Sequence, residues 1–543
     1  MKNTMTLKSC LVLFFLMINS VWSQQQFITG KVVDAKTAEP IVFATIRVKG
    51  RALGIITNED GSFRIPLKYK EYGDVIEVSS MGYQNIELAI ESLLTKDLNI
   101  VRLEPGVLEL EESVVVGKRK RRRVLTARQI VKRAIAAIPD NYPTTPFSVL
   151  GYYRDYQKKE DEYINLNEAI LEVFDSGFNE FDYETTKTSL YDYKKNTDFL
   201  RDTLADKPYS YGDVSKIMNN AYLPSYGGNE FVILRIHDAI RNYRTNSFDF
   251  VNNMSKGEIL RNHSFEKKAD TYSNKEYLYT INITKKAPGF SVIGRIYISK
   301  NDYAIHKLEY AIYDEREKNN DPWLQQRRIY GKLLFEVMVA YARGEKDKMY
   351  LNYISFHNTF KVAKPSKFLL EELAIVPYEG AFVLRFNNPL AYIKPTLREI
   401  ERKVDNRKWY DFNLNGKKLK FDKILVMDNK TVYLYPRMDA IQLRNMMNTL
   451  SKMQQEKQDI GQILRFTVSG LQDLEGNSLN TMEYTDYNQF REFFVQEVKL
   501  DPYNLEDKLF MDNTKPIFQD QPLRKPANFA DYWMNTPLQK NLN

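Results

Sequence analysis

The sequence predicts a mainly β protein, in which a small β-sandwich precedes a large antiparallel meander with covering helices and a smaller β-rich C-terminal part. The chain of 543 residues contains 36 Tyr and 30 Phe but only 4 Trp, and aromatic side chains pack well on pleated sheets. Short runs of alternating apolar and polar residues recur along the chain between turn residues. The composition, 43% hydrophobic, excludes a collagen-like, disulfide-stapled or wholly disordered chain and leaves room for several domains.

Residues 1–23 have the features of a secretory signal peptide. Lys2 and Lys8 precede an apolar run at 10–18, and small residues stand before a cleavage position at the end of this segment. The run is shorter than the roughly 20 residues of a membrane helix, although an uncleaved anchor is the alternative interpretation. The sequence therefore predicts an exported chain with no integral membrane segment after cleavage. Cys10 lies within the signal, so the mature chain would have no disulfide.

Residues 24–104 are predicted to form the sandwich. Five short runs in this segment alternate apolar and polar residues, and Asp60-Gly61 can supply the positive φ angles of a tight turn. Phe63 follows the turn and is expected to point inward. About eighty residues in such short strands can close only as a small sandwich.

Three stretches of this module resemble a known family: GKVVDAKTAEPIVFATIRVKG, TNEDGSFRI and VSSMGYQ. They are similar to the carboxypeptidase-like regulatory domain, a transthyretin-like β-sandwich at the front of exported Bacteroidetes proteins. The resemblance implies an interaction module without peptidase activity, because this module accompanies the catalytic domain of carboxypeptidases and has no zinc ligands of its own. It also implies a periplasmic or outer-membrane-associated protein. The matching residues are Gly30, Pro40, Ala44, Gly54, Thr57, Asp60, Gly61, Phe63, Gly82 and Tyr83.

Residues 105–125 are predicted to be a linker with an acidic start and a basic end. The segment ELEESVVVG resembles the TonB-box-like segment that follows the same module in outer-membrane receptors, and it could pair with a partner's sheet by strand addition. The basic run 118–123 is interpreted as a solvated linker, with contact to anionic lipid headgroups as the alternative. The run supplies six charges of a net charge of +8. The rest of the chain is nearly balanced, so no broad basic face for nucleic acid is predicted.

Residues 126–394 are predicted to form the antiparallel central domain. Thr126 is expected to cap a helix that ends at Pro139 and covers a sheet. Runs such as EFVILRI, YLYTINITKK, FSVIGRIYIS and MYLNYISFHNTFKV are expected to be strands of a long meander. The segments GYYRDY, LNEAILEVFD and GRIYISKNDYAIHKLEYAIYD resemble the uncharacterised body of exported Bacteroidetes proteins, and the hairpins are loosely similar to the half-barrel of periplasmic lipoprotein carriers. A meander curled around a helix could form an apolar groove for a lipid.

Two pairs of residues match the H-x-x-E spacing of zinc sites. His306 and Glu309 lie in a predicted strand, where residues three apart face opposite sides and cannot easily share a metal. His263 and Glu266 lie in a polar stretch without flanking ligands, so both pairs are interpreted as chance matches. The remaining histidines, interpreted as hydrogen-bonded strand residues, are His237 and His357.

Carboxylates offer a second set of candidates. Glu168 and Glu172 could act as a general acid and base, but along one face of a strand they would stand about 13 Å apart, which is too far for a retaining pair. Asn58, Glu59 and Asp60 could bind calcium, yet such a site needs six or more oxygens, and the same residue types often cap a turn. The sequence thus predicts no catalytic, cofactor-binding or metal-ligating residue.

Residues 395–485 are predicted to form an Ig-like β region with an inserted helix. A hairpin has its tip at 428–430, and the polar helix after it carries Met446, Met447 and Met453, which are interpreted as core residues and not as a soft-metal site. The end of the region resembles the last strand of bacterial Ig-like domains, through Gln472, Asp473, Glu475, Gly476 and Asn477.

Residues 486–543 are predicted to be a C-terminal extension. Its first part, QFREFFVQEV, is amphipathic and is expected to dock on the body. The tail from Asp501 is rich in Pro, Asp and Asn and is expected to drape along the surface, with Trp533 and Leu538 as anchors.

Together these features predict a noncatalytic exported binding or structural protein of the cell envelope, in which the regulatory domain is an interaction module. Its partner would be a cell-envelope protein or a lipid; no cofactor and no nucleic acid are expected, and the oligomeric state is open. One alternative is an envelope hydrolase that uses carboxylates such as Glu168, which needs titratable groups that converge in a cleft. The other is a periplasmic lipid or lipoprotein carrier, which needs a dry groove of roughly several hundred Å³.

Overall fold

The computed structural model describes residues 27–50, 53–106, 125–208, 216–217, 229–251, 258–273, 276–318, 331–391, 405–502 and 509–538. The chain divides into two compact units, one of residues 1–361 with 486–543 and one of residues 362–485. Each unit has its own hydrophobic core, and the protein is mainly β, as predicted. The predicted signal at 1–23 and most of the predicted linker, 107–124, lie outside the described residues.

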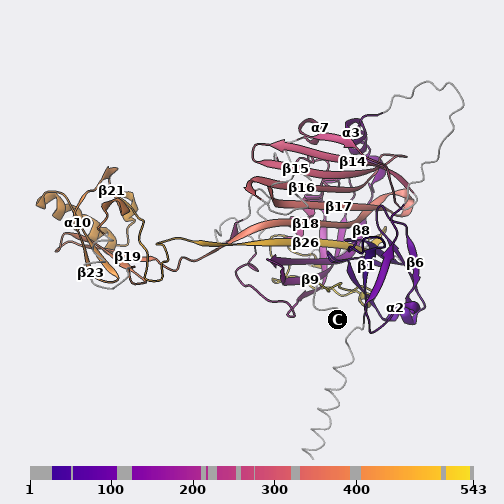
Figure 1. Ribbon diagram of the computed structural model, residues 1–543, viewed down its shortest axis with the longest axis horizontal. Coiled ribbons are helices and arrows are strands. Elements are labelled where there is room, and N and C mark those ends of the chain that lie inside the picture. The colour runs from indigo at the N-terminus through magenta and orange to yellow at the C-terminus, as the bar shows by residue number, and fades with distance from the viewer. Residues whose placement is uncertain are drawn as a thin grey trace, which may run out of the picture. The chain divides into compact units, whose positions relative to one another are not determined.

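The N-terminal module is a β-sandwich, as predicted (Figure 1). Phe63 is fully buried in its core. The described strands of its first sheet, in spatial order, are β4 (Ser62–Pro66), β1 (Phe27–Asp34) and β7 (Asn99–Leu103). Those of its second sheet are β3 (Gly54–Ile56), β2 (Thr45–Val48), β5 (Val75–Ser79) and β6 (Ile86–Ala89). The short helical elements are α2 (Lys68–Glu71) and η2 (Ile90–Ser92).

The tight turn predicted at Asp60-Gly61 joins β3 to β4. Gly61 has a φ of 77°, and its N–H donates a hydrogen bond to the Asn58 carbonyl at 2.9 Å. A Cβ on Gly61 would stand 2.6 Å from the Val32 carbonyl oxygen. Only glycine fits here, because the backbone conformation is left-handed and the neighbouring strand is close.

The largest element of the first unit is an antiparallel sheet that has 12 strands among the described residues (Figure 1). Consecutive hairpins build most of it, in agreement with the predicted meander. The strands on its main path, in spatial order, are β10 (Lys187–Lys195), β9 (Glu162–Asp175), β8 (Phe147–Lys159), β26 (Glu483–Lys499), β18 (Met349–Lys364), β17 (Gly331–Arg343), β16 (Ile305–Lys318), β15 (Phe290–Ser299), β14 (Glu276–Ala287) and β12 (Ser264–Lys267). Two short strands pair beside this path, β11 (Lys216–Ile217) with β18 and β13 (Thr271–Ser273) with β14.

Strand β26 corrects the expectation for the start of the C-terminal extension. The segment QFREFFVQEV does not dock on the body from outside but lies inside the sheet, hydrogen-bonded to β8 and adjacent to β18. Its residues are buried on both faces: Phe493 and Val495 join one core, and Phe494 joins the other. A strand covered on both faces carries large residues at consecutive positions, and in sequence this pattern is hard to distinguish from a docking helix.

Helices cover one face of the sheet, here called the inner face. Thr126 caps α3 (Ala127–Ala136) as predicted: its hydroxyl accepts from the Gln129 N–H at 3.3 Å, and the Gln129 side chain accepts from the Thr126 N–H. The apolar side of α3 joins the inner core through Ile130 and Val131. The other helical elements of this unit are α4 (Ile138–Asn141), α5 (Asp182–Thr185), α6 (Glu230–Ile236), α7 (Ile259–Asn262), η3 (Glu345–Asp347) and η7 (Phe529–Asp531).

The expectation that EFVILRI forms a strand was wrong, because this run is helix α6. Asn229 precedes the helix, and its side chain accepts from the Val232 N–H at 3.2 Å, as an N-cap does. Phe231, Ile233 and Leu234 are buried in the inner core. A short run that is mostly apolar fits a buried helix and a buried strand equally well.

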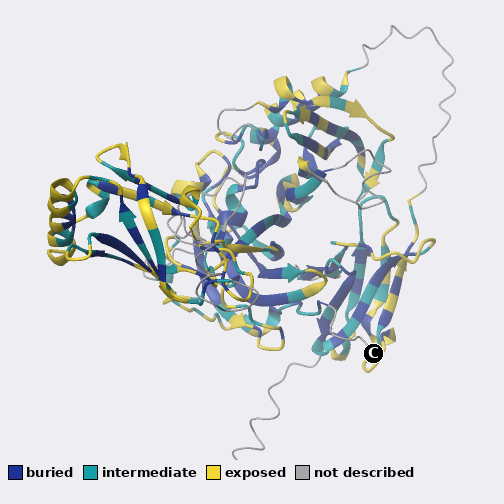
Figure 2. Cartoon of the chain, turned by 60° about the vertical axis from the view of Figure 1, so that its left-hand side comes forward, coloured by how far each residue is buried: buried dark blue, intermediate teal, exposed yellow. Residues whose placement is uncertain are grey.

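The sandwich covers the opposite face of the sheet, here called the outer face. One continuous apolar cluster contains the sandwich core together with Tyr152, Ile170 and Phe494 of the sheet and Trp533 of the C-terminal segment. The strands of the large sheet are consequently buried over most of their length (Figure 2).

The second unit packs a helix and two small sheets around a separate core. Met446 and Met447 of α10 are buried there, as expected, and Met453 is half-buried. Figure 2 shows α10 exposed along its other side. The sheet strands in spatial order are β19 (Leu370–Val376), β20 (Ala381–Phe386), β24 (Thr431–Pro436) and β23 (Phe421–Asp428), and then β22 (Lys417–Lys418), β21 (Tyr410–Leu414) and β25 (Leu464–Val468). The helical elements are α10 (Ala440–Gln455), η4 (Arg407–Trp409) and η5 (Ile460–Gln462).

This compact unit starts at residue 362, whereas the predicted Ig-like region starts at residue 395. The reason is that β20 pairs with β24 of the second unit and β19 pairs with β20, so neither strand belongs to the large sheet. Among the described residues of both units, every helix is too short or too polar to cross a bilayer.

Replacement of Phe493 by alanine tests the central position of β26. The ring is 1% exposed and packs edge-on against Phe231 at 5.2 Å. We expect Phe493→Ala to lower the free energy of unfolding by about 3–5 kcal/mol, because it leaves a cavity on the inner face. Urea denaturation followed by circular dichroism measures the change. Tyr484→Ala, on the same strand but 54% exposed, should cost less than about 0.5 kcal/mol; equal effects would contradict a buried central strand.

Candidate functional site

The turn of the sandwich that contains Asn58, Glu59 and Asp60 lies against the outer face of the sheet. The Asn58 side-chain oxygen accepts from Arg154 Nη1 at 2.5 Å, and Glu59 accepts from the Tyr163 hydroxyl at 3.0 Å. Asp60 Oδ1 accepts from the Ser62 N–H at 3.0 Å within the turn. The three residues considered as calcium ligands are thus used to shape the turn and to dock the sandwich on β8 and β9.

Arg154 lies at the centre of this contact. Its Nε donates to Glu492 Oε2 at 2.5 Å, and the two residues face each other on the neighbouring strands β8 and β26. Both side chains are almost fully buried, and the Tyr156 hydroxyl donates to the second oxygen of Glu492 at 3.0 Å. Burial lowers the pKa of Arg154, but the Glu492 carboxylate more than offsets this and holds the pKa above its usual value. A buried pair of charges requires such close partners, because desolvation costs several kcal/mol per ion.

The segment 529–538, here called the C-terminal strap, lies between the sandwich and the sheet. Trp533 Nε1 donates to the Arg64 carbonyl at 2.9 Å, while the Asn535 side chain accepts from the Arg64 N–H and donates to the Ile56 carbonyl, both at 2.9 Å. The Thr536 hydroxyl donates to Glu168 at 2.9 Å. The expected draping along the surface was therefore wrong for this segment, because its side chains bond the edge of β4 and the sheet at once.

The two candidate acid–base carboxylates lie on the outer face of β9, and the strap covers Glu168. Glu168 accepts from the Tyr152 hydroxyl at 2.7 Å and from Asn196 at 3.1 Å. Glu172 accepts from the Ser148 hydroxyl at 2.7 Å. Both carboxylates are completely buried, so neither can reach a substrate in this arrangement. Their hydrogen-bond partners indicate that the two carboxylates stabilise the packing of the sheet.

The two H-x-x-E pairs do not converge. His263 Nε2 stands 2.7 Å from the Tyr310 hydroxyl, whereas Glu266 lies in the exposed edge strand β12. Glu309 pairs with Lys307 at 2.7 Å. His306 lies instead 3.3 Å from Glu276 Oε2, a partner that the sequence did not indicate. Among the residues that the structure describes, no group of three or more His, Cys, Asp or Glu is placed to hold a metal ion.

The remaining histidines occupy different elements. His357 lies in β18, as expected, and burial lowers its pKa to about 4. His237 was expected in a strand but is the C-cap residue of α6, where its ring stacks on Phe356 at 3.8 Å. Burial lowers its pKa to about 3, so both rings are neutral near pH 7.

A cleft of about 530 Å³, here called the polar cleft, opens between the sandwich and the large sheet. Arg47 and Glu77 line its sandwich wall. Glu276, His306 and Arg343 line its sheet wall. Its further lining residues are Thr45, Ser79, Asn85, Ala342, Gly344, Glu345, Tyr350, Leu351, Asn352, Val498 and Leu500. Sequence reasoning missed this site, because the walls come from segments up to 455 positions apart (residues 45 and 500).

Hydrogen bonds organise the sheet wall of the polar cleft. Arg343 bonds both oxygens of Glu276, and its Nη2 donates to Asp302 at 2.6 Å. Burial raises the pKa of Glu276, but the neighbouring His306 and the hydrogen bonds from Arg343 lower it by more than this, to about 2. Glu276 is therefore a carboxylate at every physiological pH.

The sandwich wall of the polar cleft is fixed by a second set of contacts. Arg47 Nη2 donates to the Asn352 side-chain oxygen at 2.8 Å, and Asn352 donates to the Thr45 hydroxyl at 3.1 Å. Glu77 stands opposite Arg47 in the register of β2 and β5. Burial lowers the pKa of Arg47, and Glu77 partly offsets this.

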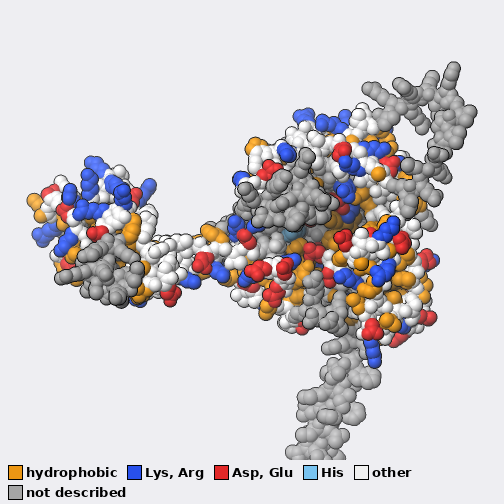
Figure 3. Space-filling model, in the orientation of Figure 1, with side chains coloured by type: hydrophobic (Ala, Val, Ile, Leu, Met, Phe, Trp, Pro, Cys, Tyr) orange, Lys and Arg blue, Asp and Glu red, His pale blue; other side chains and the backbone are white. Residues whose placement is uncertain are grey.

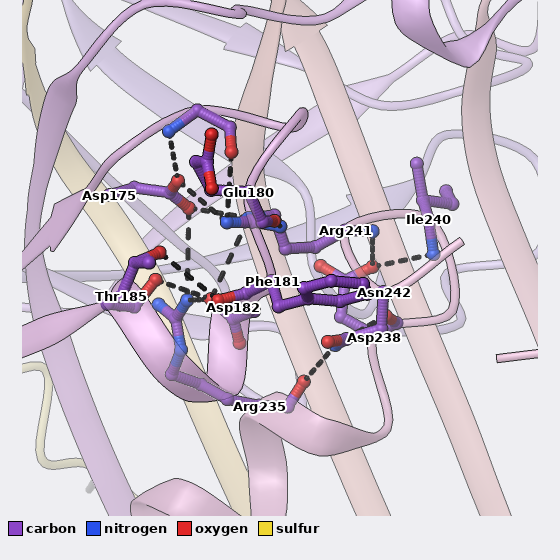
Figure 4. A network of polar contacts seen from close by, with 12 residues as sticks. Asp175, Glu180, Phe181, Asp182, Thr185, Arg235, Asp238, Ile240, Arg241 and Asn242 are labelled. Atoms are coloured by element: carbon purple, nitrogen blue, oxygen red, sulfur yellow. Dashed lines mark hydrogen bonds and ion pairs between the residues drawn. The ribbon is translucent and has the colours of Figure 1, made fainter. Parts of the chain in front are cut away.

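A network of arginines and carboxylates holds the end of α6 and the turn after it against β9 (Figure 4). Arg241 forms two hydrogen bonds to Asp175, at 2.7 and 3.0 Å, and Arg235 bonds Asp182. Asp238 accepts from the Tyr341 hydroxyl at 2.7 Å, and burial raises its pKa to about 6. The adjoining cavity measures about 30 Å³, so this network is packed and leaves no room for a substrate.

A second polar cluster lies on the inner face, opposite Arg154 and Glu492. Arg491 bonds Glu230 and donates to Asn358 at 2.6 Å. Asp155 accepts from Asn167 at 2.8 Å, and burial together with the nearby Glu230 raises its pKa to about 7. The cavity beside these residues measures about 20 Å³, which is room for about one water molecule.

Replacement of Arg154 tests the buried ion pair under the sandwich. Arg154→Met should lower the free energy of unfolding by about 3–5 kcal/mol, because it leaves the Glu492 carboxylate buried without its charged partner. The double variant Arg154→Met, Glu492→Met should lose less than the sum of the two single variants. A double-mutant cycle from urea denaturation measures the difference, and strictly additive effects would mean that the pair is not coupled.

The raised pKa of Asp155 predicts how the stability of the protein depends on pH. The folded protein holds a proton on Asp155 up to about pH 7, whereas the unfolded chain releases it near 3.8. The contribution of Asp155 to the free energy of unfolding therefore falls as the pH rises from about 4 to 7. In Asp155→Asn, the urea midpoint should fall less between pH 5 and pH 7.5 than in the unaltered protein. The exposed Glu266→Gln serves as the control, and a similar change in both variants would contradict the assignment.

Residues 28–115 match the CarboxypepD_reg-like domain family. The TonB-dependent receptor SusC of Bacteroides thetaiotaomicron is 38% identical over 103 residues, which are 19% of this chain and 9% of the receptor. The chain thus spans about a tenth of that relative's length, and the similarity concerns this one module.

Some solved structures are similar over part of the chain. A putative outer membrane lipoprotein-sorting protein domain from Vibrio parahaemolyticus covers 43% of this chain and 85% of its own, with 13% identity and a TM-score of 0.21. A LolA superfamily protein from Nitrosomonas europaea covers 43% and 86%, with 11% identity and a TM-score of 0.18. TM-scores this low do not establish a common fold. What the comparisons do establish is that the N-terminal module is a CarboxypepD_reg-like domain, as its sequence predicted.

Proposed function

We propose that this chain is a noncatalytic binding protein of the cell envelope, and that its CarboxypepD_reg-like domain is a fixed wall of the binding site. The observation that carries the proposal is the polar cleft, which has one wall from the sandwich and one from the large sheet. Its volume of about 530 Å³ lies in the range of small-molecule sites. Basic and acidic side chains are interspersed over the face shown in Figure 3, so a shaped cleft is a better basis for specific binding than surface charge.

The contacts of the sandwich support its role as a fixed wall. The turn at 58–60, Arg64 and the C-terminal strap form hydrogen bonds that are largely buried. Buried directional bonds fix the orientation of packed surfaces, because breaking them leaves unsatisfied polar groups. The cleft therefore keeps its shape in the absence of a ligand.

The arrangement of titratable groups favours binding over hydrolysis. Glu168 and Glu172 are covered by the strap and its neighbours. Asp155 has the raised pKa typical of a general acid, but it adjoins a cavity of about 20 Å³. A hydrolase needs such groups beside space for a substrate. The polar cleft has that space, and His306 lies beside Glu276 there, but Arg343 bonds this carboxylate and its pKa is lowered to about 2, which does not suit a general acid or base near pH 7.

The cavities on the inner face do not favour a lipid carrier. Two cavities on this face, within the described part of the chain, measure about 30 and 20 Å³. An acyl chain needs roughly ten times that space. The polar cleft has the required volume, but charged side chains line its walls.

Export and an envelope location form part of the proposal. The sequence of residues 1–23 and the module shared with a TonB-dependent receptor support them. Fractionation of cells that express the native chain should place it in the periplasm or at the outer membrane. The mature protein should begin near Gln24, as read by mass spectrometry. Recovery from the cytoplasm alone, with residues 1–23 retained, would overturn this part.

Binding in the polar cleft is tested with a small-molecule extract of cell envelopes. The purified full-length mature protein is incubated with the extract, washed and denatured, and the released compounds are identified by mass spectrometry. We expect a compound that the unaltered protein retains and that Ser79→Trp, which places an indole in the cleft, does not. The urea midpoint of the variant verifies that it is folded. If no compound distinguishes the two proteins, the proposed function is wrong.

The strap is tested by Asn535→Ala. This change removes the acceptor of the Arg64 N–H and the donor to the Ile56 carbonyl, and unsatisfied buried groups cost about 1–3 kcal/mol each. Hydrogen exchange should therefore become faster at Arg64 and its neighbours in β4. Exposed Asn179→Ala is the matched control. Unchanged protection of β4 in Asn535→Ala would contradict a clamping role for the strap.

A further inference from the structure

The polar cleft has an excess of negative charge. Its lining contains the carboxylates Glu77, Glu276 and Glu345 but only two guanidinium groups, Arg47 and Arg343. The charge of Arg343 is already met by Glu276 and by Asp302 and Asp347 outside the lining. The field inside the cleft therefore favours a cation, because the low-dielectric walls weaken screening.

The carboxylates of the cleft differ in their freedom to accept a ligand. Glu276 is bonded to Arg343 and lies beside His306. Glu77 accepts a hydrogen bond from Asn85 at 3.1 Å and stands opposite Arg47 in the register of β2 and β5, and Glu345 is exposed in the turn η3. An ammonium group with three donors can bridge such acceptors, whereas a planar guanidinium would need a paired, fork-like arrangement.

The rest of the lining fits an apolar body attached to that cation. Leu351, Val498 and Leu500 supply aliphatic surface. Arg47 of the sandwich wall donates to Asn352 of β18 at 2.8 Å, and both side chains line the cleft. Such groups can donate to the carbonyl oxygens of a peptide backbone. A volume of about 530 Å³ accommodates a molecule of a few residues.

We propose that the polar cleft binds the free N-terminus of a short peptide, with its ammonium group at Glu77 and its first apolar side chain on Leu351, Val498 and Leu500. This inference rests on the proposed function and specifies its ligand class. Charge selects the amine, the aliphatic surface selects the side chain, and the limited volume excludes a folded partner.

The probe is the tripeptide Leu-Leu-Ala, titrated into the full-length mature protein by isothermal calorimetry. We expect binding of the free peptide and a loss of at least about tenfold in affinity for N-acetyl-Leu-Leu-Ala, because acetylation removes a charge-assisted hydrogen bond. The C-terminal amide, Leu-Leu-Ala-NH₂, should bind about as well as the free peptide. Equal affinity for the acetylated and free peptides, or no binding of the free peptide at millimolar concentration, would overturn the inference.

Two matched variants assign the ammonium site. Glu77→Gln should weaken binding of the free peptide by at least about tenfold and leave the weak binding of the acetylated peptide unchanged. Glu87→Gln removes the same charge on the neighbouring strand β6, where Glu87 pairs with Lys49 outside the cleft, and should have little effect. Equal losses of affinity in both variants would mean that the overall negative charge attracts the peptide and that Glu77 is not a specific binding site. If envelope compounds are retained in a Ser79-dependent manner while no amine dependence is found, the proposed function stands and this inference fails.

Discussion

The large antiparallel sheet has to bury both of its faces, and the rest of the first unit depends on this constraint. Phe493 and Val495 of β26 point into the inner core, whereas Phe494 points into the outer one. Helices such as α3 and α6 cover the inner face. The outer face carries aromatic side chains that water would otherwise contact, and the CarboxypepD_reg-like sandwich covers them. The module is therefore part of the body and not an appendage on a tether.

Polar groups determine how the sandwich sits on the sheet. Apolar contact alone tolerates many orientations, whereas buried hydrogen bonds are satisfied in few. Arg154, Glu492 and Asn58 form one such set, and the strap residue Asn535 bonds both Asn58 and the backbone of the sandwich strands. The same contacts that exclude water from Glu168 and Glu172 leave the polar cleft open at another part of the interface. The interface that docks the sandwich on the sheet thus also forms the cleft in which we propose that a ligand binds.

Sequence patterns predicted the elements with short-range signals. Alternation at period two predicted most strands, Asp60-Gly61 predicted the turn, and Thr126 predicted the start of α3. Two failures share one cause. EFVILRI and QFREFFVQEV are short and buried on most sides, so their hydrophobic pattern does not distinguish a helix from a strand. The pairing of β20 with β24, which moves a unit boundary, depends on hydrogen bonds between distant segments. A local sequence pattern does not predict hydrogen bonds between distant segments.

The sequence by itself determined the mainly β character, the identity of the first module and the location of its tight turn, because each depends on residues that are neighbours along the chain. Only the tertiary structure decided which carboxylates are covered, which histidine meets which acid and where a cleft remains. Arg47, Glu276 and Arg343 lie far apart in sequence, and the cleft that they line exists only once the sandwich has docked on the sheet. The physical reason is that the burial and the electrostatic partners of a side chain depend on which residues lie near it in three dimensions. Folding brings together residues that are distant in the sequence.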